Sequence, residues 1–359
     1  MKRLILFAIV LAVLAVPLPP SGAQTPYYSG KTIEIVVPFA TGGGTDIESR
    51  FFAPFFEKHI PGNPRVIVRN APGGGSVLGA NAFVATAKPD GLTLLATSGS
   101  TVIPYILQVP QVRYDFRKWK LIKVNGVGGA IYVSPRTNVK RVEDLTKPNE
   151  RLIYGGISAT ALDLIMLLTF EVLGLDVKSV LGFEGRGPAR LAFERGEVNI
   201  DYQTTPAYLS QVAPLVKEGK AVPVVTMGFV NERGQLVRDP SLKEIPTVYE
   251  AYEAIHKRKP DGLLRWKAYM ALIGPGFSYQ KALWAPEGTP PEALQPLLDS
   301  IDRMNRDFQF KTQGKAVLEG YTVSRGDTAE PAVHRSMRVT LDVVKYIKDL
   351  LRDKYNVSI

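Results

Sequence analysis

The sequence contains no cysteine, and histidine occurs only three times among its 359 residues. Without cysteine the chain can form no disulfide framework and carries no lipid-anchored cysteine at its amino terminus. The histidines, His59, His256 and His334, lie far apart and lack the short spacing that is typical of metal ligands. We therefore interpret each histidine as a structural or surface residue, and we expect neither a metal nor a cofactor.

Enzyme motifs are also missing. Ser98 lies in Ala-Thr-Ser-Gly-Ser rather than in the Gly-x-Ser-x-Gly turn of the α/β hydrolases. The stretches Gly-Gly-Gly-Thr-Asp at 42–46 and Pro-Gly-Gly-Gly-Ser at 72–76 match neither the dinucleotide fingerprint Gly-x-Gly-x-x-Gly nor a Walker sequence with its lysine. We expect a protein that is not an enzyme.

Long hydrophobic runs are absent except at the amino terminus. Lys2 and Arg3 precede the apolar run Leu4 to Val16, and the small residues 21–23 follow it. This order predicts a secretory signal peptide over residues 1–23, with the mature chain beginning near Gln24. A membrane anchor is the alternative, but the run is shorter than the roughly 20 residues that a spanning helix needs. We expect an exported protein of the periplasm.

Positive charge is in modest excess and is not concentrated. The chain has 44 Lys and Arg and 34 Asp and Glu, and removal of Lys2 and Arg3 leaves 42 − 34 = +8. The cations are interleaved with acids, as in the stretch at 237–246, instead of forming a basic stripe with stacking aromatics. We expect a solvated surface and no binding of nucleic acid.

Short apolar runs alternate with stretches of helical periodicity along the mature chain. Two α/β units are predicted, because strands separated by helices favour a parallel sheet covered on both faces. In the first unit the expected strands are 32–39, 65–70 and 90–99, with helices 46–59 and 77–87. In the second the strands are 151–156, 177–183, 197–203 and 221–228, with helices 161–174, 187–196 and 206–219. Further helical patterns cover 262–274, 290–308 and 331–355.

The stretch Val37 to Phe52 joins the first strand to the first helix through three glycines. Thr45 and Glu48 have the spacing of a capping box, which predicts that the helix begins at about Asp46. Glycines 42–44 would then let backbone N–H groups approach a ligand at the positive end of a helix, where an anion binds well. A tight turn without a ligand is the alternative. Small hydroxylic loops at 96–101 and 154–160 also follow strands, where open α/β sheets bind ligands.

Four stretches, 31–56, 66–100, 244–250 and 285–294, resemble the extracytoplasmic solute receptors of tripartite tricarboxylate transporters. The resemblance implies an α/β, periplasmic binding protein-like fold, with two α/β lobes, a hinge and a central ligand cleft. It also implies that a small organic carboxylate binds in the cleft. We expect a first lobe from 24–128 and 229–359, including the C-terminal helices, and a second lobe from 129–228.

In the family, backbone amides, hydroxyls and ordered waters of the loop matching Phe39–Asp46 receive a carboxylate, and two further loops complete the site. The resemblance and the loop pattern together give the expected ligand residues. They are Phe39, Ala40, Thr41, Gly42, Gly43, Gly44, Thr45, Asp46, Ser98, Gly99, Ser100, Gly156, Ser158, Ala159, Thr160, Phe183, Glu184, Arg186 and Asp201.

The sequence departs from the family pattern most clearly after the strand at 177–183. Phe183-Glu184-Gly185 replaces the usual Tyr-Lys-Gly, and Arg186 follows. Glu184 would repel a second carboxylate, unless Arg186 takes it as a bidentate partner; alternatively the two side chains pair with each other at the rim. We expect a monomeric receptor that delivers its ligand to membrane transporter subunits. A receptor that presents its ligand to a membrane sensor protein is the alternative.

Overall fold

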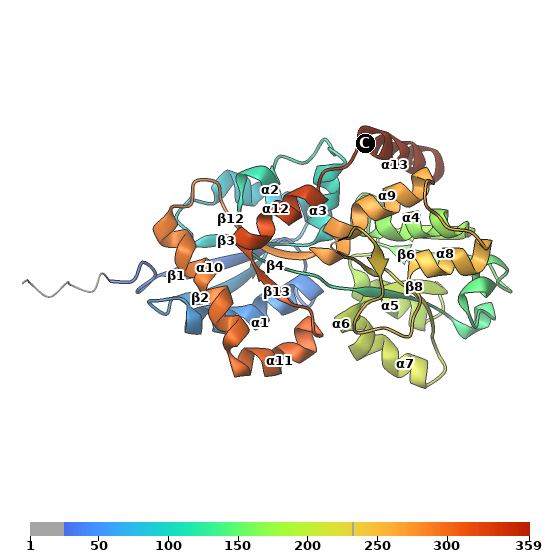
Figure 1. Cartoon of the computed structure of the whole chain (residues 1–359), viewed down its shortest axis with the longest axis horizontal. Helices are drawn as coiled ribbons and strands as arrows, with labels where there is room; N and C mark the ends of the chain where they lie inside the picture. Colours follow the sequence, from blue (N-terminus) through green and yellow to red (C-terminus); the bar gives the residue numbers. More distant parts are fainter. Residues whose placement is uncertain (1–24, 232) are drawn as a thin grey trace, which may run out of the picture.

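The computed structural model describes residues 25–231 and 233–359. The expected signal peptide, residues 1–23, and the expected new terminus at Gln24 lie outside the described residues. Two lobes lie side by side along the long axis of the molecule, each built around its own sheet (Figure 1). The prediction of an α/β fold with two lobes is confirmed.

The first lobe contains a six-stranded sheet in the order β13-β4-β12-β3-β1-β2. Strand β1 pairs in parallel with β2 and β3, whereas β12 pairs antiparallel with β3 and β4. The strands are β1 (Thr32–Val37), β2 (Arg65–Asn70), β3 (Thr93–Thr97), β4 (Lys120–Asn125), β12 (Lys281–Ala285) and β13 (Val323–Arg325). The carboxyl ends of β1, β2, β3 and β4 therefore meet at one edge, together with the beginning of β12.

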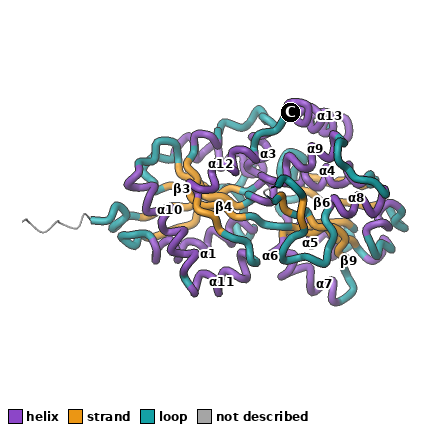
Figure 2. Tube along the Cα trace, viewed as in Figure 1, coloured by secondary structure: helices purple, strands orange, loops and turns teal. Residues whose placement is uncertain are grey.

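Helices cover both faces of the first sheet (Figures 1 and 2). They are α1 (Gly44–His59), α2 (Val77–Thr86), α3 (Gly99–Ile106), α10 (Pro291–Arg306), α11 (Phe308–Leu318) and α12 (Gly326–Ser336). Ile33, Ile35 and Val37 of β1 share a core with Phe52 and Phe56 of α1. Val36, which points to the other side of the strand, belongs to the cluster that contains Phe83 of α2. Burial on both faces explains why β1 is continuously apolar from Ile35 to Val37.

The second lobe contains a five-stranded sheet in the order β7-β6-β8-β5-β9. Its strands are β5 (Gly129–Val133), β6 (Leu152–Gly156), β7 (Val177–Leu181), β8 (Ile200–Thr204) and β9 (Val222–Thr226). The helices are α4 (Asp163–Leu173), α5 (Arg186–Glu194), α6 (Thr205–Ala207) and α7 (Ala213–Lys217), with a π-helical turn at Tyr208–Val212. Strand β6 runs parallel to β7 and β8, so the loops after these strands also share one edge.

The segment after β9 contributes to both lobes, which differs from its expected place in the first lobe alone. A short hairpin, β10 (Phe229–Val230) and β11 (Leu236–Val237), precedes α8 (Val248–His256), α9 (Leu264–Ile273) and, beyond β13, α13 (Leu341–Tyr355). Helices α8 and α9 contact α4, and α13 contacts α9. Lys354 of α13 also pairs with Glu171 of α4. These three helices therefore pack on the second lobe, α8 and α9 against α4 and α13 against α9, on the right in Figure 1.

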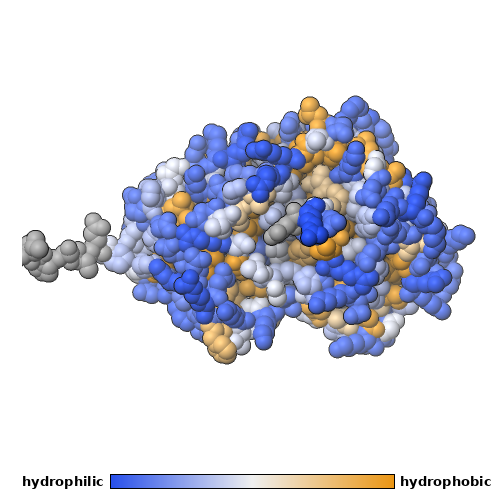
Figure 3. Space-filling model, in the orientation of Figure 1, coloured by the Kyte–Doolittle hydropathy of each residue, from blue (hydrophilic) through white to orange (hydrophobic). Residues whose placement is uncertain are grey.

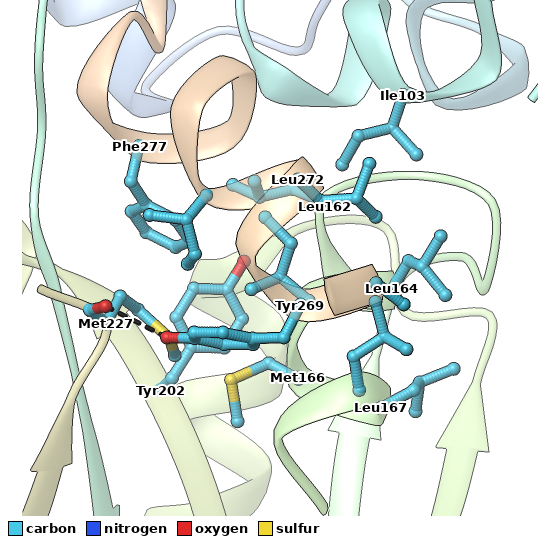
Figure 4. Packing of buried hydrophobic residues seen from close by; sticks show 14 of the residues in the cluster. Ile103, Leu162, Leu164, Met166, Leu167, Tyr202, Met227, Tyr269, Leu272 and Phe277 are labelled. Atoms are coloured by element: carbon cyan, nitrogen blue, oxygen red, sulfur yellow. Dashed lines mark hydrogen bonds between the residues drawn. The ribbon is translucent and has the colours of Figure 1, made fainter. Parts of the chain in front are cut away.

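Apolar packing joins the two lobes. Ile103 of α3, in the first lobe, and Leu162, at the start of α4, belong to the same buried cluster as Tyr269, Leu272 and Phe277 (Figure 4). The Tyr269 hydroxyl donates a hydrogen bond of 2.9 Å to the carbonyl of Met227, where the chain leaves β9. Residues 274–278, a π-helical turn, then lead back to β12 of the first sheet. The lobes are thus held together by buried contacts as well as by the chain crossings.

Two expectations about the chain beyond residue 229 are corrected. The pattern at 331–355 predicted one helix, but Met337–Thr340 separates α12 from α13. Strands β12 and β13 were not predicted.

The surface agrees with the expectation of a solvated surface: Figure 3 shows hydrophilic residues over most of one face, with smaller apolar areas between them. Within the described residues no helix has the length and apolar character needed to cross a membrane.

Candidate functional site

The glycine loop after β1 is open to solvent. Ala40, Thr41 and Gly42 to Gly44 are exposed, and α1 begins at Gly44. Gly42 has φ = +80°, a left-handed conformation that glycine adopts without strain. The first amides of a helix have no partners within the helix. The loop therefore offers backbone donors at the positive end of α1, where a carboxylate would be stabilised.

The buried carboxylate of Asp46 holds this loop through hydrogen bonds. Its Oδ2 atom accepts a hydrogen bond of 2.8 Å from the Gly42 amide, and its Oδ1 atom accepts one of 2.9 Å from Asn70 Nδ2. Arg50 lies 3.0 Å from the same Oδ1 atom. Asn70 also donates to the carbonyl of Phe39 at 3.0 Å. The side chain of Asp46 thus faces the loop backbone instead of the solvent, as expected for a carboxylate that supports the loop and does not meet an anion directly.

The predicted capping box at Thr45 and Glu48 is wrong. The N-cap is Gly43, which has no side chain, and no side-chain hydrogen bond caps the helix. Thr45 and Glu48 instead lie on the buried face of α1. The Thr45 hydroxyl accepts a hydrogen bond of 2.7 Å from Lys281 Nζ, and Glu48 forms an ion pair with Lys123. Contacts with the two buried lysines therefore take the place of helix capping at Thr45 and Glu48.

Lys123 and Lys281 were missed by the sequence reasoning. Lys281 begins β12 and Lys123 lies in β4, two strands that were not predicted. Burial lowers the pKa of Lys281 to about 8; Lys123 acts in the same direction and Glu48 against it. A lysine inside or directly before a short apolar run, as in Leu-Ile-Lys-Val and Lys-Ala-Leu-Trp-Ala, was the available signal. Such a lysine in a buried strand needs a partner or a function.

The second predicted loop forms the N-terminus of α3. Ser98 is the N-cap, and its Oγ atom accepts a hydrogen bond of 3.2 Å from the Ser100 amide. Ser98 and Gly99 are buried, and a Cβ atom on Gly99 would lie 2.8 Å from the Leu162 side chain of the second lobe. The Leu162 amide donates to Ser100 Oγ at 3.4 Å. This loop therefore contacts the second lobe directly.

The third predicted loop follows β6 and meets Ser100 through Leu162. Gly156 and Ala159 are buried, whereas Ser158 and Thr160 are half-buried. The hydroxyls of Ser158 and Thr160 lie 3.2 Å apart, and the Ser158 Oγ atom accepts a hydrogen bond from the Thr160 amide at 3.3 Å. The structure thus brings the second and third predicted loops together at the boundary between the lobes.

Phe183 and Glu184 lie at the end of β7. The Phe183 ring packs on β6, where a Cβ atom on Gly155 would lie 3.0 Å from it. Glu184 is exposed. Gly185 is the N-cap of α5, which begins at Arg186. The alternative in which Glu184 and Arg186 pair with each other at the rim is not found among the described residues, because the arginine turns into the lobe.

Arg186 and Asp201 belong to a buried polar network inside the second lobe. The guanidinium contacts Asp201 and donates to Asp163 Oδ1 at 3.1 Å and to the carbonyl of Gly155 at 2.9 Å. Burial raises the pKa of Asp201, although Arg186 acts against this. The Tyr132 hydroxyl donates to Asp201 Oδ2 at 2.5 Å. Both predicted residues therefore direct their polar atoms to partners inside the lobe, except for Arg186 Nε, which is buried without a hydrogen-bond partner.

The site offers donors and small hydroxyls rather than reactive groups. Within 25–231 and 233–359, no group of three or more His, Asp and Glu residues could hold a metal ion. Exposed backbone amides lie at the start of α1, and serine and threonine hydroxyls line the loops at 98–101 and 158–160. This arrangement is suited to binding a small anion.

Comparison with known proteins gives a consistent result. Residues 58–268 match the model of the tripartite tricarboxylate transporter family receptor. Protein BugT from Bordetella pertussis is 25% identical over 327 residues, which cover 87% of each chain. Among solved structures, MatC from Rhodopseudomonas palustris with bound malate has a TM-score of 0.63 at 23% identity, covering 88% of this chain and 99% of MatC. A second R. palustris protein, solved with adipate, has a TM-score of 0.65 at 20% identity, covering 89% and 97%.

The matched region is more than half of the chain, and the similar structures share its two-lobed fold. The chain therefore belongs to the tripartite tricarboxylate transporter receptor family, whose members are periplasmic solute-binding proteins and not enzymes.

Proposed function

We propose that this protein captures a small organic carboxylate in a cleft between the two lobes and delivers it to a tripartite tricarboxylate-type membrane transporter. The observation that carries the proposal is the exposed glycine loop at the start of α1, whose Gly42 amide is fixed by Asp46. Backbone amides at a helix N-terminus bind a carboxylate without requiring a cation in direct contact. The remaining ligand residues expected from the sequence would complete the site from both lobes.

Two similar proteins support the ligand class. MatC was solved with bound malate, and a second R. palustris protein was solved with adipate. Both molecules are small dicarboxylates. The exposed Glu184 at the second lobe disfavours a second carboxylate at that position. We therefore favour a ligand whose carboxylate binds the first-lobe loop and whose other end is neutral, aromatic or a hydrogen-bond donor.

The experiment is a thermal-shift screen of the mature protein against malate, adipate, aromatic acids and amino acids. A ligand that binds only the folded protein raises the melting temperature by mass action. Each acid is paired with its neutral amide, for example adipate with adipamide, because the amide has nearly the same shape without the charge. A shift with acids and none with their amides supports the proposal. Equal shifts with acid and amide, or none in the whole panel, would contradict it.

Delivery is tested separately. The mature receptor, which we propose to be a periplasmic monomer beginning near Gln24, is immobilised with and without ligand and exposed to the membrane subunits of the transporter. Ligand should increase retention, because contacts from both lobes exist only in the closed state and bias that population. Retention of a sensor-protein ectodomain in place of the transporter subunits would favour the alternative receptor function.

A further inference from the structure

Lys281 lies at the edge of the first sheet where β1, β3 and β4 end. It is the first residue of β12, and in the antiparallel registers it pairs with Asn125 while its neighbour Ala282 pairs with Thr97. Asn125 ends β4 and Thr97 ends β3. The side chain reaches beneath α1, where its Nζ atom would lie 3.6 Å from a Cβ atom on Gly44. Lys281 thus lies between the glycine loop and the loop that begins at Ser98.

The ammonium group of Lys281 has no carboxylate partner. Its side chain donates to the Thr45 hydroxyl at 2.7 Å, and no ion pair of Lys281 is found in the part of the chain that the structure describes. The neighbouring carboxylate, Glu48, is committed to Lys123 and also accepts from Asn125 Nδ2 at 3.4 Å. With all three groups ionised, Glu48, Lys123 and Lys281 carry one negative and two positive charges, and burial lowers the pKa of both lysines. One positive charge is left without compensation.

Burial makes this charge costly. Lys281 is 8% exposed. A buried cation without a counter-ion destabilises the protein unless the group loses its proton or an anion approaches. The cavity next to it, lined by Thr45, Glu48, Lys123 and Lys281 among others, has a volume of about 10 Å³. This space holds about one water molecule and no organic acid. An acid that serves as counter-ion to Lys281 would therefore have to lie outside this cavity.

We propose that Lys281 is a positioning residue that supplies the positive charge for anion capture at the glycine loop, acting through the Thr45 hydroxyl and the first turn of α1. This inference rests on the proposed function and adds the source of the selectivity for anions. Because the Thr45 oxygen accepts a hydrogen bond from the ammonium, its own proton is directed elsewhere and is free to be donated. The ammonium strengthens that donor and adds to the field of the helix N-terminus.

Ligand binding should then depend on pH. The titratable groups that face Lys281 are Glu48 on α1 and Lys123 on β4, whose own pKa is lowered by burial, while Thr97 at the end of β3 is uncharged. In the free protein burial holds the pKa of Lys281 at about 8. A bound anion raises it, because it favours the charged form. Affinity should therefore be constant well below pH 8 and should fall as the pH rises above it.

The experiment measures the affinity for adipate by calorimetry from about pH 6 to about pH 9.5, a range that spans the free-protein pKa and leaves the carboxylates ionised. The proteins are the wild type, Lys281→Met, Lys281→Arg and the control Lys311→Met. Lys311 is an exposed residue of α11, so its replacement changes the net charge equally without touching the site. Malate and the acid found in the thermal-shift screen are used in the same way.

Lys281→Met should bind about tenfold to a hundredfold more weakly at neutral pH, as expected for the loss of a charged hydrogen-bond donor. It should also show no pH dependence. Lys281→Arg, whose guanidinium does not titrate in this range, should keep its affinity at high pH. The Lys311→Met control should behave as the wild type. Melting temperatures without ligand show that the variants are folded, and Lys281→Arg decides the matter if Lys281→Met does not fold.

Three outcomes would overturn the inference. A wild type that binds an acid with the same affinity at every pH would do so, as would Lys281→Met with wild-type affinity, or Lys281→Arg with the wild-type pH profile. In each case the proposed function stands, because the acid still binds. A wild type that binds no acid of the panel contradicts the proposed function, and this inference fails with it.

Discussion

The amide of Gly42 donates a hydrogen bond of 2.8 Å to the Oδ2 atom of Asp46, four residues further along the chain. This contact fixes an exposed loop to the buried side of the helix that the loop precedes. Asp46 also accepts from Asn70, at the end of the neighbouring strand β2. The loop that we propose as the anion site is therefore held by the sheet before any ligand arrives, which lowers the entropic cost of binding.

Replacement of Asp46 by Ala should weaken ligand binding and destabilise the fold by about 1–3 kcal/mol, because the Gly42 amide and Asn70 lose their acceptor. Burial alone would raise the pKa of Asp46, but the hydrogen bonds from Arg50, Gly42 and Asn70 outweigh it and lower the pKa. The wild type should therefore lose this stabilisation as the pH falls through the lowered pKa. Urea unfolding of the wild type and the variant from neutral to acidic pH measures the loss of stability and its dependence on pH. If the free energies of unfolding of the two proteins differ by the same amount at every pH, the assignment is contradicted.

Arg186 should matter for the stability of the second lobe more than for ligand contact. Arg186→Met leaves Asp163 and Asp201 buried without their cation, which should cost about 3–5 kcal/mol in the free energy of unfolding. The matched control is Arg190→Met in the same helix, whose partner Glu194 is 33% exposed, whereas Asp163 and Asp201 are buried; its loss should cost at most about 1 kcal/mol. Denaturant unfolding compares the two, and similar losses in both variants would show that the buried network contributes little.

Gly128 lies where the chain passes from the first sheet to the second, against a buried cluster that draws on both lobes. There Asp239 accepts hydrogen bonds from Thr205 and Tyr321 at 2.8 Å and 2.7 Å. A Cβ atom at Gly128 would lie 1.7 Å from Asp239 Oδ2. Gly128→Ala should therefore destabilise the protein by at least about 1–3 kcal/mol through overpacking.

The control for this prediction is Gly187→Ala in helix α5, where an added Cβ atom meets nothing within 4 Å. Alanine is the better helix former there and should add about 0.5–1 kcal/mol of stability. Thermal unfolding of both variants provides the measurement. If Gly128→Ala is as stable as the wild type, the crossing does not pack against Asp239 as tightly as the structure indicates.

Glu184 is exposed at the end of β7 and should influence the choice of ligand. Glu184→Lys should strengthen adipate relative to hexanoate, which has the same chain length and one carboxylate. The gain should reach at most about fivefold, since an exposed pair contributes only ~0 to 1 kcal/mol. Calorimetric titrations of both acids provide the ratio. An unchanged ratio would show that this loop does not select the ligand.

Much of the fold follows from local pattern, because the parallel strands read as short apolar runs between helices, whether they are largely buried like β1 or stand at a sheet edge like β2 and β7. Strands β1, β2, β3, β6 and β7 were predicted for this reason. Strands β4 and β12 were not: Lys123 interrupts the apolar pattern of β4, and β12 begins with Lys281 and has only four apolar residues after it. These lysines form contacts with α1 that are distant in sequence, which no local window shows. The same contacts explain why the capping box at Thr45 failed.

The candidate site shows the same limit. The three loops could be predicted because glycine and small hydroxylic residues at strand ends have a local meaning. The direction of the Arg186 side chain could not, since it depends on Asp163 and Asp201 from two other elements. The place of α8, α9 and α13 on the second lobe also depends on contacts across the sequence, such as that of Lys354 with Glu171.

The most direct test of the central claim is calorimetric titration of the wild type and Gly43→Val with the best acid from the screen. Gly43 has φ = −76°, which valine adopts, and a Cβ atom there would make only an ordinary contact of 3.4 Å with the Ala40 carbonyl. The variant should therefore fold with a melting temperature near that of the wild type. Its side chain would cover the exposed amides, and the account predicts that binding is lost. Unchanged affinity in the folded variant would show that the glycine loop is a turn and not the anion site.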